Sequence, residues 1–170
     1  MKKIILLSVF SILFVFTYAQ EKKSKLPSID VKNMLGETIN TRDISNDGKP
    51  IILSFWATWC KPCIKELTTI ADVYEEWQED TGVKLVAVSI DNTRSSSKVL
   101  PLVNGKGWEY EVILDSNGDF KRAMGVNMVP HTFLLNGKGE VVWQHTSFSE
   151  GSELELIEMV KKVANGEKLD

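Results

Sequence analysis

The spacing of hydrophobic and polar residues predicts strands and helices in alternation. Residues 51–57 are almost wholly apolar, as in a buried strand, and follow a turn-rich segment at 46–50. Hydrophobic residues then recur at helical spacing across 64–77, and Gly82 marks the expected end of one continuous helix. Residues 83–90 return to strand-forming types. This order predicts two parallel neighbouring strands joined by a helix.

Weaker patterns on either side of this unit predict further elements. Residues 29–39 alternate loosely around Gly36, which predicts a short hairpin. The remaining elements are expected to be a helix at 95–104 limited by Pro101, a strand at 110–114, a short helix at 119–124, and a hairpin formed by 132–135 and 140–146.

The last element is predicted to be a helix that begins with a capping box, Ser152-Glu153-Leu154-Glu155. Its inward positions are expected to be Leu154, Ile157, Val160 and Ala164. The whole pattern predicts an α/β fold with a central mixed sheet, helices on both faces and an added N-terminal hairpin.

The N-terminal residues differ from the rest of the chain. Lys2 and Lys3 precede an apolar run at 4–16, and Ala19 is a small residue suited to cleavage before Gln20. Residues 1–19 are therefore expected to be an export signal, or alternatively a retained membrane anchor. Residues 20–25 are expected to form a linker and 26–170 one domain, located in the periplasm or the cell envelope.

Charge excludes one class of partner. Without Lys2 and Lys3, 18 basic residues face 23 acidic ones, which gives a net charge of −5. An acidic domain has no electrostatic basis for binding nucleic acid. We therefore expect no nucleic-acid partner.

The chain has two cysteines, Cys60 and Cys63, at the junction between the predicted strand and helix. A bridge between them would close a very small loop and stabilise little, so reactivity is the better reason for their presence. At a helix N-terminus, free N–H groups and the helix dipole favour a thiolate at Cys60. Cys60 is thus expected to attack a substrate disulfide and Cys63, one turn later, to resolve the mixed disulfide. The thiols carry the electrons, so no cofactor is expected.

Other chemistry for the two thiols stays open at this point. The pair is half of a zinc site, for which His131 and His145 are the available additional ligands. Two soft thiolates also suit Cu(I), so a copper-handling protein that binds through Cys60 and Cys63 is the main alternative, although no metal site is expected. A peroxidase-type site is disfavoured, because no threonine stands three residues before either cysteine.

Two segments resemble the thioredoxin superfamily: Trp56-Ala57-Thr58-Trp59-Cys60-Lys61-Pro62-Cys63 and Val129-Pro130-His131-Thr132-Phe133. The early hairpin and the additional helix–strand segment at 93–114 resemble its exported TlpA/ResA-like branch. The resemblance spans residues 26–164 and implies a thioredoxin-like fold with disulfide-exchange activity on protein substrates.

The same resemblance implies how substrate is bound and how electrons arrive. It places a cis proline at Pro130 against the cysteines, so that Val129 offers its backbone N–H and C=O to an extended substrate. Trp59 would supply an apolar contact. The resemblance favours the reductive direction, which in an oxidising compartment requires a membrane-bound thiol electron donor.

The chain departs from the family pattern at residues linked to proton transfer and within the cysteine motif. Thioredoxins carry a buried aspartate six residues before the first cysteine, where this chain has Ser54. Glu66 is a candidate proton relay, with exposure at the surface as the alternative. Lys61 replaces the acidic residue common in ResA-like proteins, and His131 follows Pro130, where a packing role is favoured over proton transfer.

Overall fold

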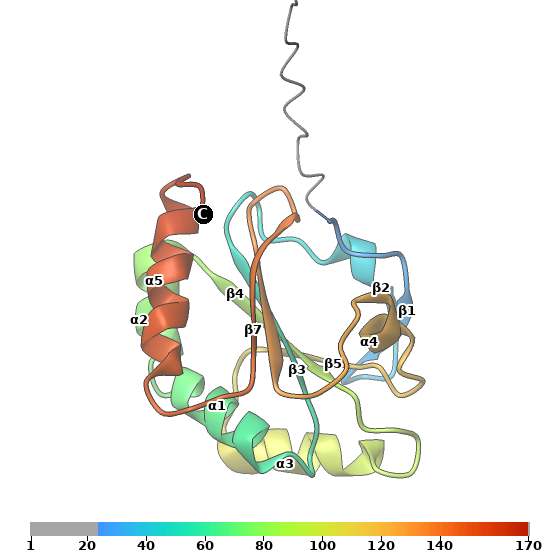
Figure 1. Cartoon of the computed structure of the whole chain (residues 1–170). Helices are drawn as coiled ribbons and strands as arrows, with labels where there is room; N and C mark the ends of the chain where they lie inside the picture. The colour runs from blue at the N-terminus through green and yellow to red at the C-terminus, as the bar shows by residue number, and fades with distance from the viewer. Residues whose placement is uncertain (1–23, 170) are drawn as a thin grey trace, which may run out of the picture.

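A computed structural model describes residues 24–169, which build one mixed seven-stranded sheet in the order β2-β1-β5-β4-β3-β6-β7 (Figure 1). The predicted export signal at 1–19 lies outside the described residues. None of the helices within 24–169 is long and apolar enough to cross a membrane. The strands are β1 (Asp30–Asn33), β2 (Thr38–Asn40), β3 (Ile51–Trp56), β4 (Lys84–Ser89), β5 (Glu111–Leu114), β6 (His131–Leu135) and β7 (Val141–Thr146).

The strand pairing confirms the predicted mixed sheet. β3 and β4 are parallel neighbours, as are β4 and β5, whereas β6 is antiparallel to both β3 and β7. The predicted N-terminal hairpin is present as β1 and β2, and β1 joins the sheet by antiparallel pairing with β5. β3 is therefore a central strand, and its C-terminal end leads directly to the cysteines.

Helices cover both faces of the sheet, as expected from the sequence. Alternate residues of β3 face opposite sides, so Ile52 and Trp56 pack with α1, α2, α3 and α5 in one cluster, hereafter the α1-side cluster. Phe55 packs with Phe120 of α4 in a second cluster on the other face, the α4-side cluster. The helices are α1 (Lys61–Ala71), α2 (Tyr74–Thr81), α3 (Val99–Lys106), α4 (Asp119–Ala123) and α5 (Ser152–Ala164), with short 3₁₀ helices at Thr41–Asp43 and Ser96–Lys98.

The prediction of one continuous helix after the cysteines was wrong, because α1 ends at Ala71 and α2 begins at Tyr74. At the break, Val73 leaves the helical region with φ −123° and its N–H bonds to the carbonyl of Ile70. The bend lets Tyr74 and Trp77 of α2 join the core along with α1. Gly82 ends α2 in the left-handed conformation, as predicted.

Pro101 does not limit its helix, contrary to expectation. It is the third residue of α3, which begins at Val99 and continues to Lys106. The first N–H groups of a helix have no partner within the helix, so a proline in the first turn removes no hydrogen bond.

The final helix begins where predicted, but the face that it buries differs from the expected one. Ser152 is its first residue and not its cap, since Gly151 precedes it in the left-handed conformation and the Ser152 hydroxyl accepts a hydrogen bond from the Ser149 N–H. Leu156, Ile157 and Val160 are buried, whereas Leu154 is 65% exposed and Ala164 is exposed. Leu156 takes the inward position in place of Leu154, because two residues along a helix lie on nearly opposite sides.

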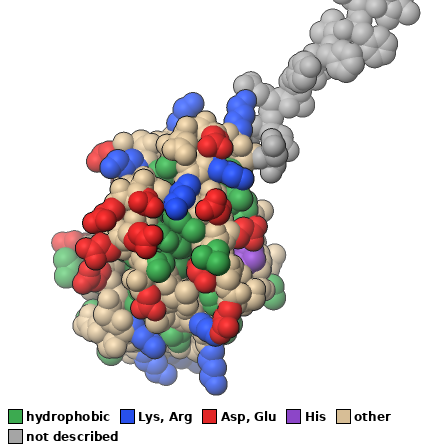
Figure 2. All heavy atoms as spheres, turned by 90° about the vertical axis from the view of Figure 1, so that its left-hand side faces the viewer, with side chains coloured by type: hydrophobic (Ala, Val, Ile, Leu, Met, Phe, Trp, Pro, Cys, Tyr) green, Lys and Arg blue, Asp and Glu red, His purple; other side chains and the backbone are tan. Residues whose placement is uncertain are grey.

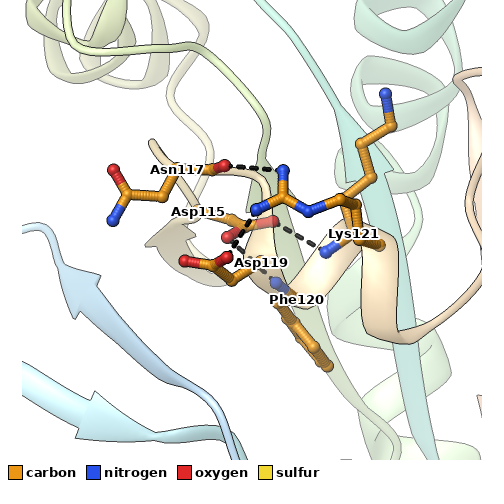
Figure 3. Close-up of polar contacts among 6 residues, drawn as sticks. Asp115, Asn117, Asp119, Phe120 and Lys121 are labelled. Carbon is orange, nitrogen blue, oxygen red and sulfur yellow. Dashed lines mark hydrogen bonds and ion pairs between the residues drawn. The ribbon is translucent and has the colours of Figure 1, made fainter.

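An acidic turn holds α4 against the sheet (Figure 3). The buried Asp115 carboxylate accepts hydrogen bonds from the backbone N–H groups of Phe120 (3.2 Å) and Lys121 (2.8 Å). The Arg122 guanidinium bonds to the Asp119 carboxylate and to the carbonyl of Asn117. The turn thereby directs Phe120 inward, with its ring 5.2 Å from that of Phe55.

Charge is distributed unevenly over the surface. Figure 2 shows the side that carries α2 and α5, where acidic side chains surround a central group of apolar ones. Both helices carry acidic residues in their first turns: Glu75, Glu76, Glu153 and Glu155. The first turns of α2 and α5 therefore contribute acidic side chains to this face.

Candidate redox-active site

The two cysteines lie where β3 passes into α1. Cys60 is the N-cap of α1, and its Sγ accepts a hydrogen bond from the Cys63 N–H at 3.3 Å. The two sulfurs form a disulfide with a Cα–Cα distance of 5.3 Å. Lys61 and Pro62 occupy the first two helical positions, where a proline is tolerated. This placement directs the positive end of the helix and one backbone donor at the Cys60 sulfur, which favours its thiolate form after reduction.

The cysteines differ in their access to solvent. Cys60 retains 5% of its surface, whereas Cys63 has none. Trp59, directly before Cys60, is 64% exposed although it is a large apolar residue. Cys60 is therefore the more accessible of the two cysteines, and it follows an exposed aromatic residue.

Asp91, which the sequence analysis did not single out, fixes the turn before the cysteines. It follows β4 and is fully buried. Its carboxylate accepts hydrogen bonds from the Thr58 N–H (2.8 Å), the Thr58 hydroxyl (2.7 Å) and the Ser89 hydroxyl (3.0 Å). The residue's type offers no sequence signal for this role, because its partner Thr58 is 33 positions away and is reached only through the pairing of β3 with β4.

The Val129–Pro130 peptide bond is cis, in agreement with the implication of the family resemblance. The β3–β6 register pairs Phe55 with His131, so Pro130 lies beside the end of β3 that leads to the cysteines. Pro130 is buried and its carbonyl accepts a hydrogen bond from the Ser147 N–H. The backbone N–H and C=O of Val129 make no hydrogen bond to any other residue within 24–169.

Glu66 is buried, which excludes the alternative of simple surface exposure. It is 4% exposed and one turn after Cys63 on the same side of α1. The Thr132 hydroxyl donates to its carboxylate at 2.9 Å and the Ser54 hydroxyl at 3.4 Å. Burial raises the pKa of Glu66 to about 7, against the opposing effect of these two hydrogen bonds. Position 54, where thioredoxins have an aspartate, is thus a serine whose hydroxyl contacts a carboxyl group from α1.

The two histidines lie on opposite faces of the sheet. His131 stacks on Phe133, with ring centroids 4.5 Å apart, and its Nε2 is 3.2 Å from the Gln144 side-chain oxygen. Phe133 belongs to the α4-side cluster, so His131 has a packing role on that face. His145 is paired with Thr132 and therefore lies on the α1 face, stacked on Trp143. Among residues 24–169, no three His, Cys, Asp or Glu side chains are grouped so that they could hold a metal ion.

A solved structure shares this fold, and curated relatives are named thiol-disulfide oxidoreductases. A thioredoxin-like protein from Porphyromonas gingivalis superimposes with a TM-score of 0.75 at 52% identity, over 82% of this chain and 92% of that one. Sporulation thiol-disulfide oxidoreductase A of Bacillus subtilis is 35% identical over 72% of this chain and 73% of its own length. Thiol-disulfide oxidoreductase ResA of Bacillus anthracis is 31% identical over 86% and 83%. Fold and relatives together define a thioredoxin-like thiol–disulfide oxidoreductase.

The family is shown by a direct match. The model of the AhpC/TSA family matches residues 23–144, which include the cysteine motif and the cis proline. The chain belongs to this family. Its similarity to ResA and to the B. subtilis sporulation protein also confirms the ResA-like resemblance of the sequence motifs.

Proposed function

We propose that this protein is an exported reductase of protein disulfides in which Cys60 is the nucleophile and Cys63 the resolving thiol. The observation that carries the proposal is the difference between the two sulfurs: Cys60 caps α1 and keeps some exposure, whereas Cys63 is buried behind it. The Cys60 thiolate attacks one sulfur of a substrate disulfide, forms a mixed disulfide and releases the first substrate thiolate. Cys63 then attacks the Cys60 sulfur, closes the Cys60–Cys63 disulfide and releases the second.

Glu66 supports the second step as a proton acceptor. Cys63 must lose its proton before it can attack, and it is fully buried, so bulk water does not reach it. Glu66 lies one turn along the same helix and has a pKa near 7, so it is partly ionised at neutral pH and able to accept that proton.

Three residues are proposed to bind the substrate chain. The unpaired backbone groups of Val129 would hydrogen-bond to an extended segment around the substrate disulfide. Pro130 lies beside the end of β3 that leads to the cysteines, and the exposed Trp59 ring would supply apolar contact.

The apolar run at 4–16 supports export to the periplasm or cell envelope through a signal at 1–19, followed by a linker at 20–25 and the domain at 26–170. Export also bears on the direction of electron transfer. A reductase in an oxidising compartment must have its dithiol regenerated, and we propose a membrane-bound thiol electron donor for this purpose.

The first test is the reduction potential of the Cys60–Cys63 couple. The purified domain from residue 20 onward is equilibrated with defined thiol/disulfide buffers, and the two redox states are separated after alkylation. A potential near that of thioredoxin, about −270 mV, is expected for a reductase. A potential near that of DsbA, about −120 mV, would reverse the proposed direction. The absence of a reversible two-electron couple would remove the catalytic role of both cysteines.

The order of attack is tested by trapping. Cys63→Ser should accumulate a mixed disulfide between Cys60 and a protein with intact disulfides, such as native insulin. Non-reducing electrophoresis and mass spectrometry would detect this product. Cys60→Ser is the matched control and should trap much less, because Cys63 is buried. Equal trapping by the two variants would contradict the assignment.

A further inference from the structure

A small cavity with a mostly apolar lining and a few polar groups lies beside Glu66, on the side of the sheet that carries the cysteines. Its volume is about 10 Å³, and its polar lining comes from Glu66 of α1, Thr132 of β6, His145 of β7, and Ser152 and Glu153 at the start of α5. A cavity of this size holds about one water molecule when polar groups surround it. The cavity therefore connects the buried carboxyl group to the part of the fold where α5 begins.

His145 has a polar atom in this region without a partner. The β6–β7 register places His145 opposite Thr132, whose hydroxyl donates to Glu66. The Nε2 atom of His145 is buried and has no hydrogen-bond partner among residues 24–169. A buried polar atom left unpaired is destabilising, so a water molecule bound between Nε2 and Glu66 would satisfy both groups.

We propose that His145, through one water molecule in this cavity, carries protons between Glu66 and the solvent, so that a protonated Glu66 can lose its proton before it accepts that of Cys63. The inference rests on the proposed function, since it supposes that Glu66 takes the proton of Cys63. In each cycle the protonated Glu66 gives its proton to the water, which passes one to Nε2. His145 then releases the proton on its Nδ1 to solvent. His145 is thus a positioning residue that acts through Glu66.

The charged surroundings of the cavity suit this transfer. The titratable groups that face it are Glu66 from α1 and Glu153 from α5, and no Lys or Arg is among its lining residues. Tyr110, which packs near Glu66, donates its hydroxyl to the carbonyl of Leu67, and burial raises its pKa, so it stays protonated. A proton that crosses the cavity meets no positive charge on the way.

His145 is also partly exposed to solvent, as the proposed proton path requires. His145 as a whole is only half-buried although its Nε2 is inaccessible, so the exposed part of the residue lies elsewhere than at Nε2. An imidazole accepts a proton at one nitrogen and gives one up from the other, which an amide or a hydroxyl at this position does not do near neutral pH.

The test follows the resolving step directly. The reduced protein is mixed with 5,5′-dithiobis(2-nitrobenzoate) in a stopped-flow instrument from pH 5 to 9. The first thionitrobenzoate released reports attack by Cys60, and the second reports attack by Cys63. His145→Gln should slow the second release about tenfold below pH 7 and leave the first unchanged. The difference should vanish above about pH 8, where Glu66 has already lost its proton.

Two further variants make the result specific. His131→Gln is the matched control, because His131 lies on the opposite face of the sheet, and it should behave as the wild type. His145→Ala should be slow in the same pH range and should recover when imidazole is added. Equal second-phase rates in His145→Gln and the wild type, a slowing that is the same at every pH, or a lack of imidazole rescue would each overturn the role of His145.

A measurement without turnover separates this inference from the proposed function. In the oxidised protein, the ¹³C resonance of the Glu66 carboxyl group is followed by NMR through its titration. The wild type should show one averaged resonance, and His145→Gln should show exchange broadening because proton exchange at Glu66 is slower. Identical line shapes would overturn the relay. A wild-type protein that releases no second thionitrobenzoate would instead contradict the proposed oxidoreductase chemistry.

Discussion

At the residue scale, one buried carboxyl group, that of Glu66, sets this site apart from the thioredoxin pattern. Ser54 stands on β3 where thioredoxins have an aspartate, and Glu66 reaches the same region from α1. Its two hydroxyl donors, Ser54 and Thr132, come from neighbouring strands that pair with each other in register. A carboxyl group supplied from the helix therefore takes the place of one supplied from the strand.

The first prediction concerns Glu66 and stability. The pKa of Glu66 is 4.5 in a model peptide and about 7 here, so the folded state keeps a proton that the unfolded state has lost between these pH values. The contribution of Glu66 to the free energy of unfolding is fully present below pH 4.5 and falls by about 3 kcal/mol as pH rises to 7. Glu66→Gln, which cannot ionise, should remove this loss.

The measurement is urea unfolding of the oxidised protein at pH 4 and pH 8. Relative to the wild type, Glu66→Gln should gain stability between the two pH values. Glu158→Gln, an exposed glutamate of α5, is the control and should show no such gain. A difference between Glu66→Gln and the wild type that does not change with pH would show that burial does not shift this carboxyl group.

At the element scale, the active-site segment is held from both sides. α1 directs its N-terminus at Cys60, and the segment after β4 brings Asp91 under the preceding turn. The parallel pairing of β3 with β4 sets this contact, since both strands end at the same edge of the sheet and Trp56 pairs with Ser89. The pairing therefore fixes the position of Thr58, two residues before Cys60.

The second prediction tests this contact. In Asp91→Asn, an amide NH₂ replaces one acceptor oxygen, so at least one of the three donors loses its partner. Hydrogen bonds to a charged group contribute about 1.5–3 kcal/mol, and we expect a loss of about 2–3 kcal/mol in urea unfolding, with slower release of the first thionitrobenzoate. Thr58→Val, which removes only a hydroxyl donor, should cost less. An Asp91→Asn protein with wild-type stability and rate would contradict the role of Asp91.

At the scale of the whole molecule, one sheet separates two apolar clusters of different composition. The buried tryptophans, Trp56, Trp77 and Trp108, all belong to the α1-side cluster. The α4-side cluster has phenylalanines instead, among them Phe55, Phe120 and Phe133. Because the same β3 backbone contributes to both clusters, we expect them to unfold together.

The third prediction uses this difference. Phe120→Ala removes a fully buried ring from the α4-side cluster and should cost about 3–5 kcal/mol. Tryptophan fluorescence, which reports on the α1 side, should show the whole loss as a lower denaturant midpoint. Leu154→Ala, at a side chain that is 65% exposed, should stay within about 0.5 kcal/mol of the wild type. An unchanged fluorescence midpoint in Phe120→Ala would mean that the two clusters unfold independently.

The strand pattern was predictable because it depends on local periodicity. Each strand from β3 to β7 lies within two residues of its expected position. The errors occurred in helices, where the local pattern allowed more than one answer. The inward face of α5 could include Leu154 or Leu156, and only packing against α1 and α2 selected Leu156. The break between α1 and α2 likewise follows from the shape of the core and not from a glycine or proline at that point.

The sequence by itself determined the two cysteines at a strand-to-helix junction, the α/β order of the elements and the motif at Pro130, because each depends on residues close together in the chain. Tertiary structure alone decided that Glu66 is buried, that Asp91 holds Thr58, and that His145 faces Glu66 while His131 faces away. These contacts join residues 33 to 79 positions apart, and the register between strands places each side chain on one face of the sheet or the other. A shift of one residue in the β6–β7 register would move His145 to the face that carries His131, and no local pattern in the sequence excludes it.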